Sequence, residues 1–255
     1  MTLTELDAYF NAFLRKEEFA QDVSLNGIQV QNSAPDSMQI DKIAFAVDAC
    51  LQTILQAAEQ GAQMLFVHHG LFWGACETVT GTHYERIAAL LRNDIALYAS
   101  HIPLDANHEV GNNYGLAARL GLCDLQACGV WRGMTFGVRG EFPEPLSAAD
   151  IALRLFPHGE REARILAFGK SLSRSALVLS GGTGSDIDQA AACGADVFVC
   201  GELGHEQYHY AKEHGINVIA GGHYNTETVG VQLVAKKIAE ERRIQTVFID
   251  VPTGL

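Results

Sequence analysis

The sequence lacks several features that mark large classes of proteins. No segment approaches the roughly 20 consecutive apolar residues of a membrane-spanning helix. The opening MTLTELDAYFNAFLRKEE carries acids early and lacks the basic-then-apolar order of a signal peptide, so we expect a cytoplasmic protein with no membrane partner. None of the six cysteines forms a Cys-x-x-Cys pair, which argues against a thiolate zinc site and predicts buried free thiols.

Basic residues are also scarce. The 18 Lys and Arg residues face 30 Asp and Glu residues, which gives a formal net charge of −12. A chain this acidic does not attract the nucleic-acid backbone through its overall field, which leaves a local basic patch as the alternative route to nucleic acid. The same field favours cations. With 255 residues, 48% of them apolar, the chain can bury a sizeable core in one large domain or two smaller ones.

Short apolar runs alternate with amphipathic stretches along most of the chain. This alternation implies βαβ units and an α/β fold with largely parallel sheets. The Gly- and Pro-rich stretch 133–147 is the exception, and we expect irregular structure there. Thr4 and Asp7 resemble a capping box at the first helix. Helices are predicted over 4–16, 51–61, 84–94, 111–121 and 147–156, and strands over 43–47, 64–67, 95–99, 164–168 and 175–180.

The two halves of the sequence are weakly similar to each other. Residues 57–70 resemble 191–205, and residues 92–105 resemble 212–227. A duplicated α/β unit explains this similarity. The alternative is that any two βαβ units look alike, because similar turn residues separate their strands from their helices. We expect two lobes. The first comprises residues 1–125, with the segment 226–255 packing on it, and the second comprises 126–225.

Histidines and acids follow three of the predicted strands. They are His68 and His69, His101 and Asp105, and His223 and Glu227. Ligands of parallel α/β sheets bind outside the carboxyl ends of the strands, so these side chains can share one cleft. The alternative for each is an ordinary structural role: a hydrogen-bonded core histidine, a turn carboxylate, or an acid in the first turn of a helix.

The spacing of these residues suggests metal chelation. Neighbours on a strand point to opposite faces, so both imidazoles of His68 and His69 can reach one site only if the strand has ended, which Gly70 permits. Pro103 predicts that His101 and Asp105 lie on a loop or turn. His223 and Glu227 are four residues apart, a spacing that suits chelation on a helix that begins near Asn225.

Several ordered motifs resemble the NIF-three-like family, whose bacterial members are known as GTP cyclohydrolase I type 2 homologues. They are SLNGIQV at 24–30, HHG followed by a Phe-Trp pair, HIPLDANHEVGNN, GELGHEQ and GHYNTE, and the similarity runs from about residue 4 to the terminal FIDVP. The resemblance implies two α/β lobes, a pair of neighbouring divalent metal ions in the cleft between them, and a homohexameric ring with the sites facing its interior.

The resemblance also implies roles for individual residues. His101 is either an outer metal ligand or a hydrogen-bond partner of a ligand, and it is a weaker candidate for direct metal binding than the five ligands named below. Glu202 either orients a metal-bound water or a ligand, or is a surface acid. The metal ligands carried over by motif are His68, His69, Asp105, His223 and Glu227.

These ligands offer imidazole and carboxylate groups and no sulfur, which suits zinc, iron, manganese, cobalt or nickel. The excess positive charge of two divalent ions over two carboxylates favours a small anionic substrate such as a nucleotide. We expect a dinuclear metal-dependent hydrolase, with ring opening of GTP as the reaction that the resemblance implies. The alternatives are a metal-binding ring that serves as a regulatory or partner-binding scaffold without turnover, and a protein for metal storage or delivery.

Two further stretches leave alternatives open. SGGTGSD at 180–186 is either a phosphate-cradling turn at a helix N-terminus or a simple tight turn. The apolar LFW at 71–73 either lines a pocket or meets another subunit, or packs in the core beneath the loop.

Overall fold

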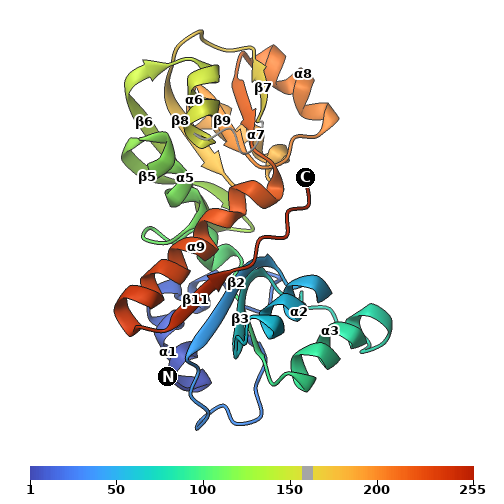
Figure 1. Cartoon of the computed structure of the whole chain (residues 1–255). Helices are drawn as coiled ribbons and strands as arrows, with labels where there is room; N and C mark the ends of the chain where they lie inside the picture. The colour runs from blue at the N-terminus through green and yellow to red at the C-terminus, as the bar shows by residue number, and fades with distance from the viewer. Residues whose placement is uncertain (157–162) are drawn as a thin grey trace. The chain divides into compact units, whose positions relative to one another are not determined.

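The computed structural model describes residues 1–156 and 163–255. The chain forms two compact units, each with its own sheet (Figure 1). The first unit comprises residues 1–104 and 230–251, and the second comprises 105–229 and 252–255. Residues 105–125, which the sequence placed in the first lobe, thus group with the second unit.

The sheet of the first unit has five strands in the order β1-β4-β3-β2-β11. β1 runs antiparallel to β4, and the other neighbouring pairs are parallel, which agrees with the expectation of a largely parallel sheet. The strands are β1 (Gly27–Val30), β2 (Lys42–Asp48), β3 (Met64–His69), β4 (Ala96–Ala99) and β11 (Gln245–Phe248).

Both faces of this sheet are buried. Phe10 of α1 (Leu3–Leu14) packs on Phe66 and Tyr98, with ring centroids 5.0 Å apart in each pair. The alternate strand residues, such as Leu65 and Leu97, join a second cluster with α2 (Leu51–Glu59) and α3 (Gly81–Arg92). Continuous burial explains why the strands read as unbroken apolar runs.

The predicted cap of the first helix is wrong. The helix begins at Leu3, so Thr2 and Glu5 form the capping box in place of Thr4 and Asp7. The 3₁₀ turn η1 (Lys16–Phe19) follows this helix.

The sheet of the second unit has six strands in the order β5-β6-β8-β9-β10-β7. Only the central β8, β9 and β10 are parallel to one another, so this sheet is mixed and the prediction of a largely parallel sheet is wrong here. The strands are β5 (Cys123–Trp131), β6 (Met134–Leu146), β7 (Arg164–Ala167), β8 (Ser173–Leu179), β9 (Val197–Cys200) and β10 (Asn217–Ala220).

On one side of the sheet, the antiparallel pairing arises from the stretch that was expected to be irregular, and on the other side from β7, which pairs with β10. Residues 134–146 form β6, where Met134, Phe136, Val138 and Phe142 are buried on alternate positions. A two-residue turn at 132 and 133, with φ values of 49° and 81°, pairs β6 with β5. The prediction of irregular structure relied on the number of glycines and prolines. It overlooked that apolar residues recur at every second position, which is the pattern of a strand.

Two helices of the second unit, α7 (Ile187–Ala192) and α8 (His205–His214), connect its three parallel strands. Each unit therefore contains a β-α-β-α-β run, β2-α2-β3-α3-β4 in the first and β8-α7-β9-α8-β10 in the second. The helices are α4 (Ile102–Asp105), which crosses the unit boundary, α5 (Asn112–Leu120), α6 (Ala148–Leu155), α7 (Ile187–Ala192) and α8 (His205–His214), with the 3₁₀ turn η2 (Gly184–Asp186).

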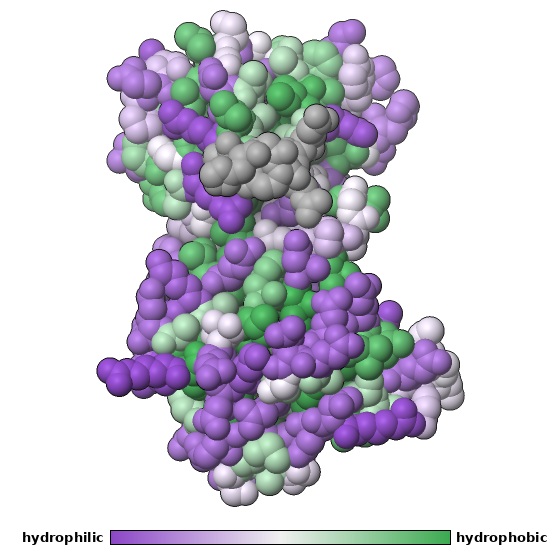
Figure 2. All heavy atoms as spheres, in the orientation of Figure 1, coloured by the Kyte–Doolittle hydropathy of each residue, from purple (hydrophilic) through white to green (hydrophobic). Residues whose placement is uncertain are grey.

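The long helix α9 (His223–Arg242) contributes residues to both units. Figure 2 shows that hydrophilic side chains cover much of the visible face of each unit, with apolar residues between them. Within the described residues, no helix has the length and apolar character that crossing a membrane requires. All six cysteines are free thiols, but only Cys200 is fully buried, and Cys76 and Cys123 are exposed, so the predicted burial is mostly wrong.

Candidate metal centre

His68 and His69 are the last two residues of β3. The strand pairs with β4 up to Val67 and Ala99, and with β2 up to Asp48 and His69. The prediction that the strand ends before the two histidines is therefore wrong. Their rings nevertheless lie side by side, with centroids 4.6 Å apart, and His68 is fully buried.

His101 lies beside this pair in the same unit. Its ring centroid is 5.1 Å from that of His68 and 5.7 Å from that of His69. One ring nitrogen from each of the three lies within 4.8 Å of the others, so one metal ion could take all three. His101 directly precedes the single-turn helix α4.

An oxygen atom holds each of the three rings through Nδ1. Nδ1 of His68 bonds the carbonyl of Ser100 at 2.9 Å, Nδ1 of His69 bonds Asp48 at 2.8 Å, and Nδ1 of His101 bonds Asp22 at 2.9 Å. A ring that donates from Nδ1 carries its lone pair on Nε2, the form that binds metal ions. The donor chemistry and the tautomers therefore fit a divalent transition metal.

The oxygen partners were not found from the sequence. Asp22 precedes the SLNGIQV stretch, and Asn26 from that stretch bonds both Asp22 and the backbone N–H of His101, at 2.8 and 2.7 Å. Burial by itself raises the pKa of Asp22, but hydrogen bonds with His101 and Asn26 outweigh it and hold the pKa below its usual value. Asp48 directly follows the predicted strand 43–47, and this position at a strand end could have marked it as a candidate partner of the histidines.

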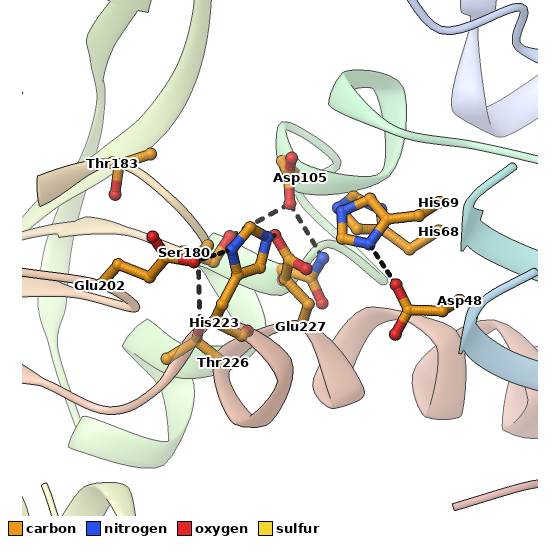
Figure 3. A network of polar contacts seen from close by, with 12 residues as sticks. Asp48, His68, His69, Asp105, Ser180, Thr183, Glu202, His223, Thr226 and Glu227 are labelled. Atoms are coloured by element: carbon orange, nitrogen blue, oxygen red, sulfur yellow. Dashed lines mark hydrogen bonds and ion pairs between the residues drawn. The ribbon is translucent and has the colours of Figure 1, made fainter. Parts of the chain in front are cut away.

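In the second unit, His223 and Glu227 lie on the first turn of α9. The helix begins at His223, two residues earlier than predicted. Nε2 of His223 is 3.2 Å from Oε1 of Glu227, and Nδ1 is 2.5 Å from Oε1 of Glu202 (Figure 3). Burial by itself lowers the pKa of His223, but Glu227 and Glu202 outweigh it and raise the pKa to about 9.

Asp105, at the end of α4, is also buried in the second unit. Its Oδ1 accepts hydrogen bonds from Nδ2 of Asn112 at 2.8 Å and from the hydroxyl of Ser180 at 3.1 Å (Figure 3). The predicted loop is one turn of helix, in which Pro103 is tolerated because it falls in the first turn. These contacts fix the carboxylate of Asp105 in one orientation.

The glycine-rich turn packs against Glu227. Gly181 has φ +69°, and a Cβ atom there would lie 2.1 Å from Oε1 of Glu227. The N–H of Gly181 also donates to the hydroxyl of Thr226 at 3.0 Å. The turn thus makes room for a buried carboxylate, a role that neither alternative from the sequence included.

A sequence model of the family Duf34/NIF3 (NGG1p interacting factor 3) matches residues 1–254. The chain belongs to this family. Its relatives include proteins named GTP cyclohydrolase 1 type 2 homolog. The one from Treponema pallidum is 46% identical over the whole of both chains, and the one from Deinococcus radiodurans is 42% identical over 98% of this chain and 94% of its own. The resemblance found in the motifs is therefore confirmed.

Solved structures of the family share the fold. A protein from Thermus thermophilus, 38% identical, superimposes with a TM-score of 0.89, and the match covers the whole of both chains. The protein ybgI, described as of unknown function, is 32% identical with a TM-score of 0.90 over the whole of both chains. The mixed α/β architecture with two sheets is thus common to this chain and to these members of the family.

Proposed function

We propose that this chain is a metal-dependent hydrolase that opens the ring of a guanine nucleotide with the help of two divalent ions. The observation that carries the proposal is the group of three histidines in the first unit, each held by an oxygen atom at Nδ1. The ion ligands in this proposal are His68, His69, Asp105, His223 and Glu227, with His101 as a further ligand.

The proposal assigns donors from both units to one pair of ions, as the family resemblance implies. Asp105 follows His101 by four residues, and α9 carries His223 and Glu227 in one unit while continuing into the other, which supports a shared site. The β-α-β-α-β run common to both units supports an origin of the two lobes by duplication. We place the protein's action in the cytoplasm.

Divalent ions would supply water acidic enough to attack at neutral pH and would polarise the bond that breaks. The chain's own residues orient the ligands: Asp22, Asp48 and Ser100 hold the imidazoles, and Asn112 and Ser180 hold Asp105. Glu202 holds His223 through one carboxylate oxygen and has a second oxygen that can accept a proton from the attacking water.

The substrate class follows from charge and from the relatives. Two divalent ions would exceed the charge of Asp105 and Glu227, and this excess favours an anion. The name GTP cyclohydrolase 1 type 2 homolog, carried by close relatives, points to GTP. Attack of water at C8 of guanine would open the five-membered ring, and hydrolysis of the resulting formamide would release formate.

Formate release from GTP by metal-reconstituted protein tests this proposal. We expect release by the wild type, none by Asp105→Asn, and wild-type release by Asp188→Asn, an exposed carboxylate of α7 that serves as the control. Absence of formate from a wild type with confirmed metal content would reject the cyclohydrolase reaction.

A second candidate is a metal-binding scaffold that engages a partner without turnover. The family description, which names an interacting factor, favours it. Co-purification of a partner that stays bound after chelation of the metals would support this function. For either function we propose a homohexamer, and light scattering that shows a monomer at micromolar concentration would contradict it.

A further inference from the structure

The apolar segment Leu71–Trp73 divides into two parts. Leu71 is buried in the core of the first unit, and Phe72 packs against the same core. Trp73 differs, because its side chain is partly exposed and stands beside the histidines. Its ring centroid is 5.1 Å from that of His101, nearly perpendicular at 79°, and 5.9 Å from that of His69.

The turn that carries Trp73 is clamped by Gln29. Oε1 of Gln29 accepts hydrogen bonds from the N–H groups of Leu71 and Phe72, at 2.7 and 3.3 Å. Its Nε2 donates to the carbonyl of Leu25 at 2.9 Å. Gly70 leaves room for this clamp, because a Cβ atom there would lie 2.3 Å from Oε1 of Gln29. Nε2 also donates to the carbonyl of Phe72 at 3.4 Å, so the side chain of Gln29 bonds four backbone groups. These bonds fix the direction in which the side chain of Trp73 leaves the turn.

Trp73 offers a flat apolar surface beside the histidines. Its polar atom, Nε1, already donates to the carbonyl of Gly70 at 3.1 Å, so a ligand would meet the π-face or edge of the ring. The chain carries a net charge of −12, which opposes the approach of an anionic nucleotide. Stacking of a base on an aromatic ring needs no charge and tolerates any base, so it can add affinity where the overall field does not.

We propose that Trp73 is the surface on which the base of the substrate nucleotide stacks, and that Gln29 is the positioning residue that holds it there. This inference rests on the proposed function, because it takes a nucleotide as the substrate. It extends that function by assigning recognition of the base to the first unit, at the residues next to its three histidines.

Binding of GTP and of inorganic tripolyphosphate to zinc-loaded protein, measured by isothermal titration calorimetry, tests the inference. Tripolyphosphate has the charged chain of the nucleotide and no base. We expect Trp73→Ala to weaken GTP binding about 5- to 100-fold and to leave tripolyphosphate binding unchanged. Trp73→Phe should retain most of the affinity, because a smaller ring still stacks.

Fluorescence gives a second readout that does not depend on turnover. The chain has two tryptophans, so Trp131→Phe leaves Trp73 as the sole indole emitter. In that background we expect GTP to quench the emission and tripolyphosphate to leave it unchanged. Gln29→Ala should shift the emission to longer wavelength as the ring becomes more exposed, and should weaken GTP binding without affecting tripolyphosphate.

Each remaining outcome has a definite meaning. If Trp73→Ala binds GTP as tightly as the wild type, the stacking inference is overturned and the proposed function stands. If Trp73→Ala weakens GTP and tripolyphosphate equally, Trp73 supports the fold or the metal site, and the inference is again overturned. If the metal-loaded wild type binds no GTP, both the inference and the guanine nucleotide substrate are overturned.

Discussion

Gly181 and Glu227 are packed so closely that any side chain at position 181 would displace the carboxylate. A Cβ atom there would lie 2.1 Å from the carboxylate oxygen Oε1. We expect Gly181→Ala to displace the carboxylate and to lower metal affinity about tenfold or more, because a misplaced ligand no longer reaches the ion. Metal content after dialysis against a weak chelator, measured by plasma mass spectrometry, checks this.

Gly194→Ala is the matched control. Gly194 has the same φ of +69°, but a Cβ atom there would have no neighbour within 4 Å. Both variants should lose about 1 kcal/mol of unfolding free energy from the left-handed backbone. Only Gly181→Ala should lose metal. Equal metal retention by the two variants would show that Glu227 does not hold an ion.

Asp48 should tune the metal affinity of His69 without touching the ion. Its Oδ1 holds Nδ1 of the ring at 2.8 Å. We expect Asp48→Ala to weaken metal binding about 10- to 100-fold, because the ring loses its orientation and part of its basicity. Competition with a fluorescent chelator measures the change. Glu59→Ala removes an equal charge from the exposed end of α2 and should have no effect.

The pKa of His223 predicts how metal binding depends on pH. With a pKa of about 9, His223 is protonated in the metal-free protein at neutral pH and must release a proton before it binds an ion. Metal affinity should therefore rise with pH through neutrality and level off near pH 9. Calorimetry in buffers with different ionisation enthalpies counts the released protons, and His223→Gln should release one fewer at pH 7.

His223 makes the stability of the metal-free protein fall with rising pH, whereas it makes metal affinity rise. The folded pKa of about 9 lies above the ordinary value of 6.5. The ion pairs of His223 therefore stabilise the fold fully below pH 6.5, and their contribution is lost as the pH rises through 9. Urea unfolding of the metal-free wild type and His223→Gln at pH 6 and pH 9.5 should show a difference that shrinks at the higher pH.

Asp196 makes the free energy of unfolding depend on pH whether or not metal is bound. Burial by itself raises its pKa, but hydrogen bonds from Lys170 and from the backbone N–H of Arg174, at 2.7 and 2.8 Å, lower the pKa below the usual value. Asp196→Asn should cost about 1–2 kcal/mol of unfolding free energy at pH 7. The difference from the wild type should start to shrink as the pH falls past about 4, the ordinary pKa of aspartate. It should be lost only as the pH falls through the lower pKa of the native carboxylate, which is then protonated as well.

The fold was predicted best where burial on both faces produced apolar runs. The strands at 43–47, 64–67 and 95–99 were found because each run is short and bounded by turn residues. The β6 strand was missed because its core residues alternate with glycine and charged residues. Tertiary pairing with β5 and β8, rather than local propensity, holds it extended.

From the sequence we could predict the candidate metal ligands of the site, but not the residues that hold those ligands in place. Histidines and acids at strand ends carry a recognisable pattern, but their hydrogen-bond partners come from remote parts of the chain. Asp22 precedes His101 by 79 residues, and Asp48 precedes His69 by 21. No local spacing rule connects such pairs, and the crowding of Gly181 against Glu227 likewise arises only from packing.

The helix α9 has a consequence for how this protein can change during evolution. Its residues up to Val229 belong to one unit, and those from Gly230 onward belong to the other, where Val231, Val234 and Ile238 are buried. Recombination that exchanged one unit between relatives would have to join two halves of α9 so that the buried face of each half still points toward its own unit. The two lobes are therefore expected to be inherited together, as a single module rather than as separable parts.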